Sequence, residues 1–306
     1  MAQAQQPTVY RVGVLLPGSH WYDIIDGLRD GLKALGLEEG KQFVLEIRDT
    51  KGDLKAAEEA ARNLEKEKVN LIFTTRTSVT IAAKRATADI PIVFSAGADP
   101  VVLGLVESFA KTGGRLTGVY EPGTDLTAKR LEILREIIPK LRRVLAFYDP
   151  RNPVASESAR LLQEEVGRLR GVELVERHFA SVEELQASVR AIRAGEGDAF
   201  FQLSDSMVNS QAQLIIDTAR VKRIPTMFLD PGSVILGGLA SYSVSFQEMG
   251  RLSAKYVQRV LAGVKPRDLP VEAVRKIDLV MNLKTAKQIG LTIPPNVLAR
   301  ADRVIR

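Results

Sequence analysis

The order of apolar segments most restricts the fold of this chain, because strand-type runs alternate with amphipathic helical segments. In the first series, the runs typical of strands cover residues 9–16, 43–47, 69–74 and 90–95. Between them, apolar residues at helical spacing predict helices at 24–35, 54–64 and 78–88. Neighbouring parallel strands need a crossover, usually a helix, so this order predicts a parallel sheet covered on both faces.

The same order begins again after Gly118, with a linking helix predicted at 126–138. The strands predicted in this second series cover 143–148, 172–177, 199–203 and 224–228. The helices predicted between them cover 155–169, 182–192 and 207–221. Residue identity between the two series is low, so the repeat is one of architecture. The predicted fold class is α/β, with two similar Rossmann-like lobes that each hold a parallel sheet.

The remaining segments are too small for a third domain. They read as a strand at 239–244, a helix around 249–260, a strand at 277–281 and a short final helix. This order suits a chain that passes between the lobes more than once, through a hinge at 118–121, 242–244 and 278–280. We therefore predict a first lobe of 8–118 plus 246–275 and a second lobe of 119–245 plus 276–306. Such a hinge permits closure and limits other motions.

Composition excludes several classes of protein. No apolar run approaches the roughly 20 residues of a bilayer-spanning helix, so no direct membrane span is predicted. The net charge is +6, but Lys and Arg are scattered among Glu and Asp, which argues against nucleic acid as a partner. With no cysteine, the chain has no disulfide and no thiolate metal site.

Ligands of parallel α/β sheets bind beyond the carboxyl ends of the strands, where loops meet helix N-termini. The loops expected there are rich in hydroxyls, small residues and single carboxylates, which suits a small polar ligand. The candidate ligand-binding residues are Ser19, Trp21, Thr75, Arg76, Thr77, Ser78, Ser95 and Asp99 in the first lobe, and Asn152, Ser204, Asp205 and Asp230 in the second.

Each candidate also has a structural interpretation. Ser, Thr and Asp before a helix are preferred N-caps, although Ser204 and Ser206 could cap in place of Asp205 and free its carboxylate for a ligand amine. Arg76 opposes the dipole of the helix that it begins, which indicates a bound carboxylate or an acidic neighbour, unless the side chain points into solvent. Trp21 could stack on a flat ligand or pack on its own lobe.

Motifs for catalysis are missing. No G-x-G-x-x-G follows the first strand, and neither a Walker sequence nor a G-x-S-x-G elbow occurs. The two histidines, His20 and His178, do not have metal-ligand spacing. Catalysis by carboxylates alone stays open, because four aspartates could converge, at positions 99, 149, 205 and 230. We predict a protein that is not an enzyme and that has no catalytic residue, cofactor or metal.

Several segments, in this order and spacing, resemble the periplasmic solute-binding components of ABC transporters, in the group that includes tryptophan-binding lipoproteins. They are residues 31–40, 90–94 with Asp99-Pro100, 116–119, 129–134, 240–242 and 282–295. The resemblance covers nearly the full chain. It implies the type I periplasmic-binding-protein fold, with two Rossmann-like lobes, three crossings between them and a ligand in the cleft.

The resemblance also implies roles for some residues. Asp205 matches an acidic position that would hold an α-amino group. Thr75, Thr77 and Ser78 would donate to a carboxylate. Arg76 departs from the small or uncharged residue expected at its position, which favours a more anionic ligand than a plain amino acid.

The predicted function is that of a solute-binding component of an ABC importer. By lobe closure it would capture a small carboxylate-bearing ligand, an amino acid or an aromatic acid, and deliver it to an ABC permease in the inner membrane. Residues 1–7 resemble the end of a secretory signal, which predicts an exported, periplasmic protein whose signal peptide has been removed. A frayed cytosolic terminus is the alternative reading of these residues. The alternative functions are a ligand-sensing module that signals to a membrane partner, or a cryptic α/β enzyme.

Overall fold

The computed structural model describes residues 9–18, 21–121, 126–193 and 195–306. The chain forms two compact units, Met1–Thr124 with Val244–Lys276 and Asp125–Ser243 with Ile277–Arg306. It therefore changes unit three times along its length. The first seven residues, whose composition indicated export, lie outside the described part.

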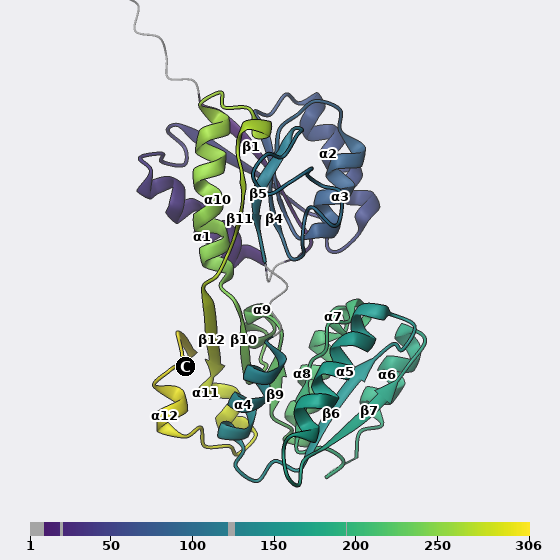
Figure 1. The fold of residues 1–306 in the computed structure, drawn as a ribbon. Coiled ribbons are helices and arrows are strands. Elements are labelled where there is room, and N and C mark those ends of the chain that lie inside the picture. The colour runs from purple at the N-terminus through teal and green to yellow at the C-terminus, as the bar shows by residue number, and fades with distance from the viewer. Residues whose placement is uncertain (1–8, 19–20, 122–125, 194) are drawn as a thin grey trace, which may run out of the picture. The chain divides into compact units, whose positions relative to one another are not determined.

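The first unit is a six-stranded sheet between two layers of helices. Its strands are β1 (Tyr10–Leu16), β2 (Phe43–Asp49), β3 (Leu71–Thr75), β4 (Ile92–Ala96), β5 (Leu116–Tyr120) and β11 (Val271–Ala273). Helices α1 (Tyr22–Ala34) and α10 (Phe246–Leu261) cover one face, while α2 (Leu54–Lys66) and α3 (Thr77–Ala86) cover the other (Figure 1). A short 3-10 helix, Pro266–Asp268, precedes β11.

The second unit contains a seven-stranded sheet. Its strands are β6 (Arg143–Tyr148), β7 (Glu173–His178), β8 (Ala199–Phe201), β9 (Thr226–Phe228), β10 (Ala240–Val244), β12 (Ile277–Asn282) and β13 (Arg303–Ile305). Its helices are α4 (Thr127–Ile137), α5 (Pro153–Gly167), α6 (Val182–Arg190), α7 (Ser206–Ser210), α8 (Ala212–Lys222), α9 (Pro231–Ile235), α11 (Leu283–Gln288) and α12 (Pro295–Leu298).

Both sheets place the first five strands of their series in the same order. That order is β2-β1-β3-β4-β5 in the first unit and β7-β6-β8-β9-β10 in the second. The pairs β1–β2, β1–β3, β3–β4 and β4–β5 are parallel, as are β6–β7, β6–β8, β8–β9 and β9–β10. The predicted fold class, with two similar α/β units, is confirmed.

Some predicted elements differ from the structure. The helix predicted at 207–221 is two helices, α7 and α8, which meet at Gln211. Val208 and Ile215 are both buried on either side of the break, so the apolar spacing did not reveal it. Several short elements were not predicted, among them β11, β13 and α9. Each has three to five residues, too few for a periodic pattern to show.

Glycines bring α1 and α10 into backbone contact in the first unit. A Cβ on Gly250 of α10 would lie 1.9 Å from the carbonyl oxygen of Ile24, and one on Gly27 of α1 would lie 2.0 Å from the carbonyl oxygen of Gln247. No residue with a side chain fits at these two positions unless the helices separate. This contact joins the segment that returns at Val244 to α1 of the same unit.

The apolar cores lie on the faces of the sheets. In the second unit one cluster joins α4, α5 and α11 to the sheet, and another joins α6 and α8 to its other face. No helix of the described residues is both long and apolar enough to cross a membrane.

Candidate ligand-binding site

Aromatic and charged side chains gather where the strands of the first sheet end. The guanidinium carbon of Arg76 lies 4.5 Å from the centroid of the Trp21 ring, and Trp21 is buried against Phe246 at a centroid distance of 4.7 Å. Beside them, a Cβ on Gly97 would lie 3.4 Å from Nη1 of Arg76 and 3.9 Å from Oε2 of Glu121. Trp21 thus packs on its own unit, and Arg76 has an acidic neighbour.

The backbone of Arg76 has a conformation that is almost restricted to glycine. Its φ is 73° and its ψ is 143°, immediately before the first residue of α3. A residue with a Cβ pays about 1–3 kcal/mol of strain in such a region, and such strain clusters at functional sites. The amide of Arg76 donates to the carbonyl of Ser95 at 2.8 Å, which joins the ends of β3 and β4.

The predicted hydroxyl residues of the first unit lie around the same place. Thr75 and Ser95 are in register on neighbouring strands, and both are buried. The hydroxyl of Ser95 has no hydrogen-bond partner among the described residues. Thr77 accepts a hydrogen bond from the Gly97 amide at 3.1 Å, whereas Ser78 is exposed in the first turn of α3. No described side chain caps this ten-residue helix.

Asp99, a further candidate of the first unit, has a local role of its own. Asp99 closes the turn after β4, because its Oδ1 accepts from the amides of Val101 and Val102 at 2.8 and 3.1 Å. Ser19 lies outside the described residues, as does His20.

In the second unit, the carboxylate of Asp205 is a helix cap. Its Oδ1 accepts from the amides of Met207 and Val208 at 2.8 and 3.2 Å, and its Oδ2 accepts from the Asp149 amide at 3.1 Å. The residue is 1% exposed. The capping role that Ser204 and Ser206 could have shared belongs to Asp205 itself, and Ser204 is exposed. The carboxylate joins the loops that follow β6 and β8.

The other candidates of the second unit also begin helices. Asn152 caps α5 through its side-chain oxygen. Asp230 caps α9, since it accepts from both the amide and the hydroxyl of Ser233 at 2.8 Å.

Asp149 receives two guanidinium hydrogen bonds from Arg151, at 2.9 and 2.8 Å, and this pairing lowers the pKa of Asp149.

Replacing Asp205 by alanine is expected to lower the free energy of unfolding by about 1–2 kcal/mol, since three backbone amides lose their acceptor. Urea unfolding followed by circular dichroism measures this loss. The neighbouring change Ser204→Ala is the control, expected to stay within about 0.5 kcal/mol because Ser204 is exposed. Equal effects of the two changes would contradict the capping role.

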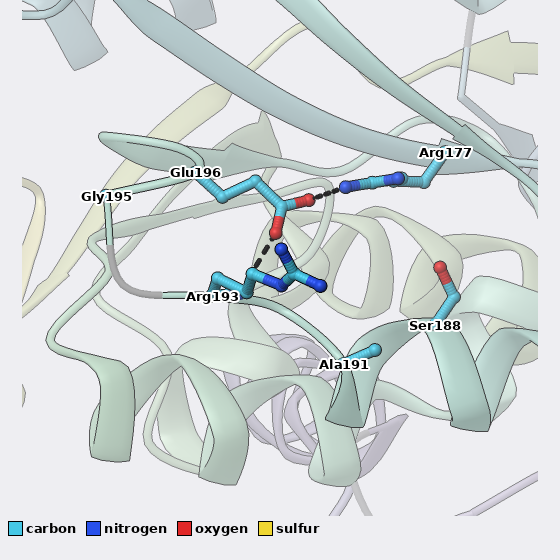
Figure 2. Close-up of a pocket in the computed structure, with 6 residues that line it drawn as sticks. All are labelled: Arg177, Ser188, Ala191, Arg193, Gly195 and Glu196. Carbon is cyan, nitrogen blue, oxygen red and sulfur yellow. Dashed lines mark hydrogen bonds and ion pairs between the residues drawn. The ribbon is translucent and has the colours of Figure 1, made fainter.

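A hollow of about 560 Å³ lies elsewhere on the second unit (Figure 2). It is lined by Arg177, Ser188, Ala191, Arg193, Gly195 and Glu196, beside the loop that enters β8. Glu196 accepts from the Arg193 amide at 2.9 Å and pairs with Arg177, and these contacts lower its pKa. None of the predicted site residues contributes to it. Among the described residues, no three of His, Cys, Asp or Glu are grouped to hold a metal ion.

Two residues of the group around Arg76 and Trp21 were not predicted, namely Glu121 and Phe246. Glu121 directly follows β5, so the rule that ligands bind beyond strand ends could have identified it. It lies in the segment 118–121, which the sequence predicts as part of a hinge. Phe246 begins a helix distant in sequence, and only the packing of α10 brings it to Trp21.

Comparison with known proteins gives matches over most of the chain. A family model described as ABC transporter substrate binding protein matches residues 11–305. The chain is 25% identical over 265 residues to the tyrosine-binding protein of Clostridioides difficile (strain R20291), which covers 87% of this chain and 76% of that protein.

Solved structures with similar folds also cover almost all of it. One is a conserved domain protein of Vibrio cholerae O1 biovar El Tor, with 30% identity and a TM-score of 0.77, covering 97% of this chain and 100% of that one. Another is an ABC domain of Streptococcus pneumoniae in complex with L-Trp, with 24% identity, the same TM-score and the same coverage.

Proposed function

The chain belongs to the ABC transporter substrate-binding protein family, and we propose that it captures a small carboxylate-bearing solute for import. The solute would be an amino acid or an aromatic acid. In this proposal the two units close on the ligand, and the closed form delivers it to a permease in the inner membrane. The protein would work on the outer side of that membrane, in the periplasm.

The observation that carries the proposal is Arg76, the residue that directly precedes the first turn of α3 and whose guanidinium lies over Trp21. An arginine fork matches a carboxylate with two hydrogen bonds, and the N-terminus of a helix adds partial positive charge. Thr77 and Ser78 lie in the same turn, and Ser78 is exposed. We propose that the carboxylate of the ligand binds here.

Closure is proposed from the path of the chain. Three connections join the units, near residues 124, 243 and 276. Several connections acting together permit a hinge motion and limit twisting. Ligand would favour the closed form only through contacts that the open form lacks, which we propose come from loops of the second unit, such as those holding Asn152, Ser204 and Asp230.

The relatives indicate which acids to test first. One is named for tyrosine, and one solved structure holds L-Trp. Aromatic amino acids are therefore the first compounds to test, followed by acidic amino acids and by aromatic acids that lack an amine.

A thermal-shift panel tests the proposal. A ligand at a free concentration of 100 times its Kd is expected to raise the free energy of unfolding by about 2.7 kcal/mol, because it binds the folded state and not the unfolded state. Uncharged sugars serve as the control class and are expected to cause no shift. Stabilisation by a sugar with none by any acid would refute the carboxylate assignment, and mass spectrometry of co-purified ligand provides an independent reading.

A further inference from the structure

The aspartates at the carboxyl ends of the strands accept hydrogen bonds from within the protein. Asp99, Asp205 and Asp230 each accept from backbone amides that they cap, and Asp149 pairs with Arg151. A ligand ammonium at Asp205 would compete with three amide donors around a carboxylate that is 1% exposed. The carboxylate that borders the position of a Gly97 Cβ together with the Arg76 guanidinium is instead that of Glu121.

We propose that Arg76 and Glu121 together receive the two charged groups of an amino acid on the first unit. The α-carboxylate binds Arg76, and the α-ammonium binds Glu121. The inference rests on the proposed function, and it narrows the ligand class from carboxylic acids to zwitterionic amino acids.

Gly97 keeps the space between the two charges open. A Cβ at this position would be 3.4 Å from Nη1 of Arg76 and 3.9 Å from Oε2 of Glu121, so both groups border the same small volume. Gly97 is exposed and is not among the glycines with positive φ. Its backbone therefore does not require glycine, and the missing side chain leaves room for a ligand.

The residues that carry the two charges are both attached to the first unit, Arg76 through its side chain and Glu121 through its backbone. The Arg76 guanidinium lies over Trp21, which in turn stacks on Phe246. The Glu121 amide donates to the carbonyl of Ala96 at 2.8 Å, which continues the β4–β5 pairing. An ammonium has three donors for a carboxylate, and a guanidinium has a fork of donors for another. The two opposite charges that border the position of a Gly97 Cβ complement an amino acid, whose ammonium and carboxylate are separated by one carbon.

The test compares amino acids with the same acids lacking the amine, by calorimetric titration of the full chain. The pairs are L-tyrosine with 3-(4-hydroxyphenyl)propionate, L-tryptophan with indole-3-propionate, and L-glutamate with glutarate. The wild type is expected to prefer the amino acid of at least one pair by about tenfold to a hundredfold, as expected for a charge-assisted hydrogen bond. Glu121→Gln is expected to reduce that preference to less than about threefold, because it lowers the affinity for the amino acid and leaves the affinity for the amine-free acid unchanged.

Three matched variants complete the test. Glu59→Gln, an exposed change on α2, is expected to keep the preference. Asp205→Asn is also expected to keep it, at reduced stability. Gly97→Ala adds a methyl group at ordinary contact distance from Arg76 and Glu121, so the variant should fold. The methyl group occupies the space proposed for the ligand, so the affinity for the amino acid is expected to fall at least about tenfold.

The outcomes separate the two proposals. A preference that survives Glu121→Gln, or that Asp205→Asn removes, overturns the inference. A wild type that binds the amine-free acids as tightly as the amino acids also overturns it and leaves the proposed function standing. A wild type that binds no acid of any pair, even though sugars stabilise it, overturns the proposed function and the inference together.

Discussion

Gly250→Ala is expected to lower the free energy of unfolding by about 3 kcal/mol or more. The added methyl carbon would lie 1.9 Å from the Ile24 carbonyl oxygen and 2.6 Å from the Leu28 amide nitrogen. Both contacts are with the backbone of α1, so no rotation of a side chain relieves them. The helices must separate, and the sheet contacts of α10 weaken with them.

Gly167→Ala is the matched control, because Gly167 is also helical, in α5, and has open space where its Cβ would be. Alanine has the higher helix propensity, so this change is expected to be neutral or to stabilise by up to about 1 kcal/mol. Urea unfolding monitored by circular dichroism measures both. Similar values for the two variants would show that α1 and α10 do not pack as closely as described.

The repeat was predictable from the sequence because each strand is followed by enough amphipathic helix to cross the sheet. The first strand, predicted at 9–16, is β1 at Tyr10–Leu16, and the strand predicted at 143–148 is β6 with the same limits. The close contact that Gly250 allows between α10 and α1 was not predictable from the sequence. A glycine inside a helix reads only as a weak helix former, and its partner lies more than 200 residues away in the sequence.

The family resemblance, and with it the prediction that the chain is not an enzyme, is confirmed by the family model. The site was harder to predict, because one residue type serves two purposes. An aspartate before a helix can cap it or bind a ligand, and the choice depends on where amides of other loops lie. Asp205 accepts from the amide of Asp149, which lies 56 residues earlier in the chain, and no local pattern contains that contact.

Arg76→Gly is expected to change stability and affinity in opposite directions. Glycine adopts φ 73° and ψ 143° without strain, and the relief of about 1–3 kcal/mol exceeds the loss of a cation–π contact worth about 0.5–1 kcal/mol. We therefore expect the free energy of unfolding to rise by about 1 kcal/mol. The affinity for the acid that gives the largest thermal shift is expected to fall at least about tenfold, because its carboxylate loses the guanidinium.

Two further variants separate strain from charge. Arg76→Ala keeps the Cβ and so keeps the strain, and it is expected to match Arg76→Gly in affinity but not in stability. Arg223→Gly removes a basic residue of positive φ, 56°, at the end of α8, and is expected to leave the affinity unchanged. Unchanged affinity in both Arg76 variants, measured by calorimetric titration, would place the carboxylate elsewhere. Arg76 lowers the stability that a glycine would give at this position, so a role in binding explains it if its removal lowers the affinity for the acid. The affinities of the two Arg76 variants, compared with that of the wild type, measure this loss directly.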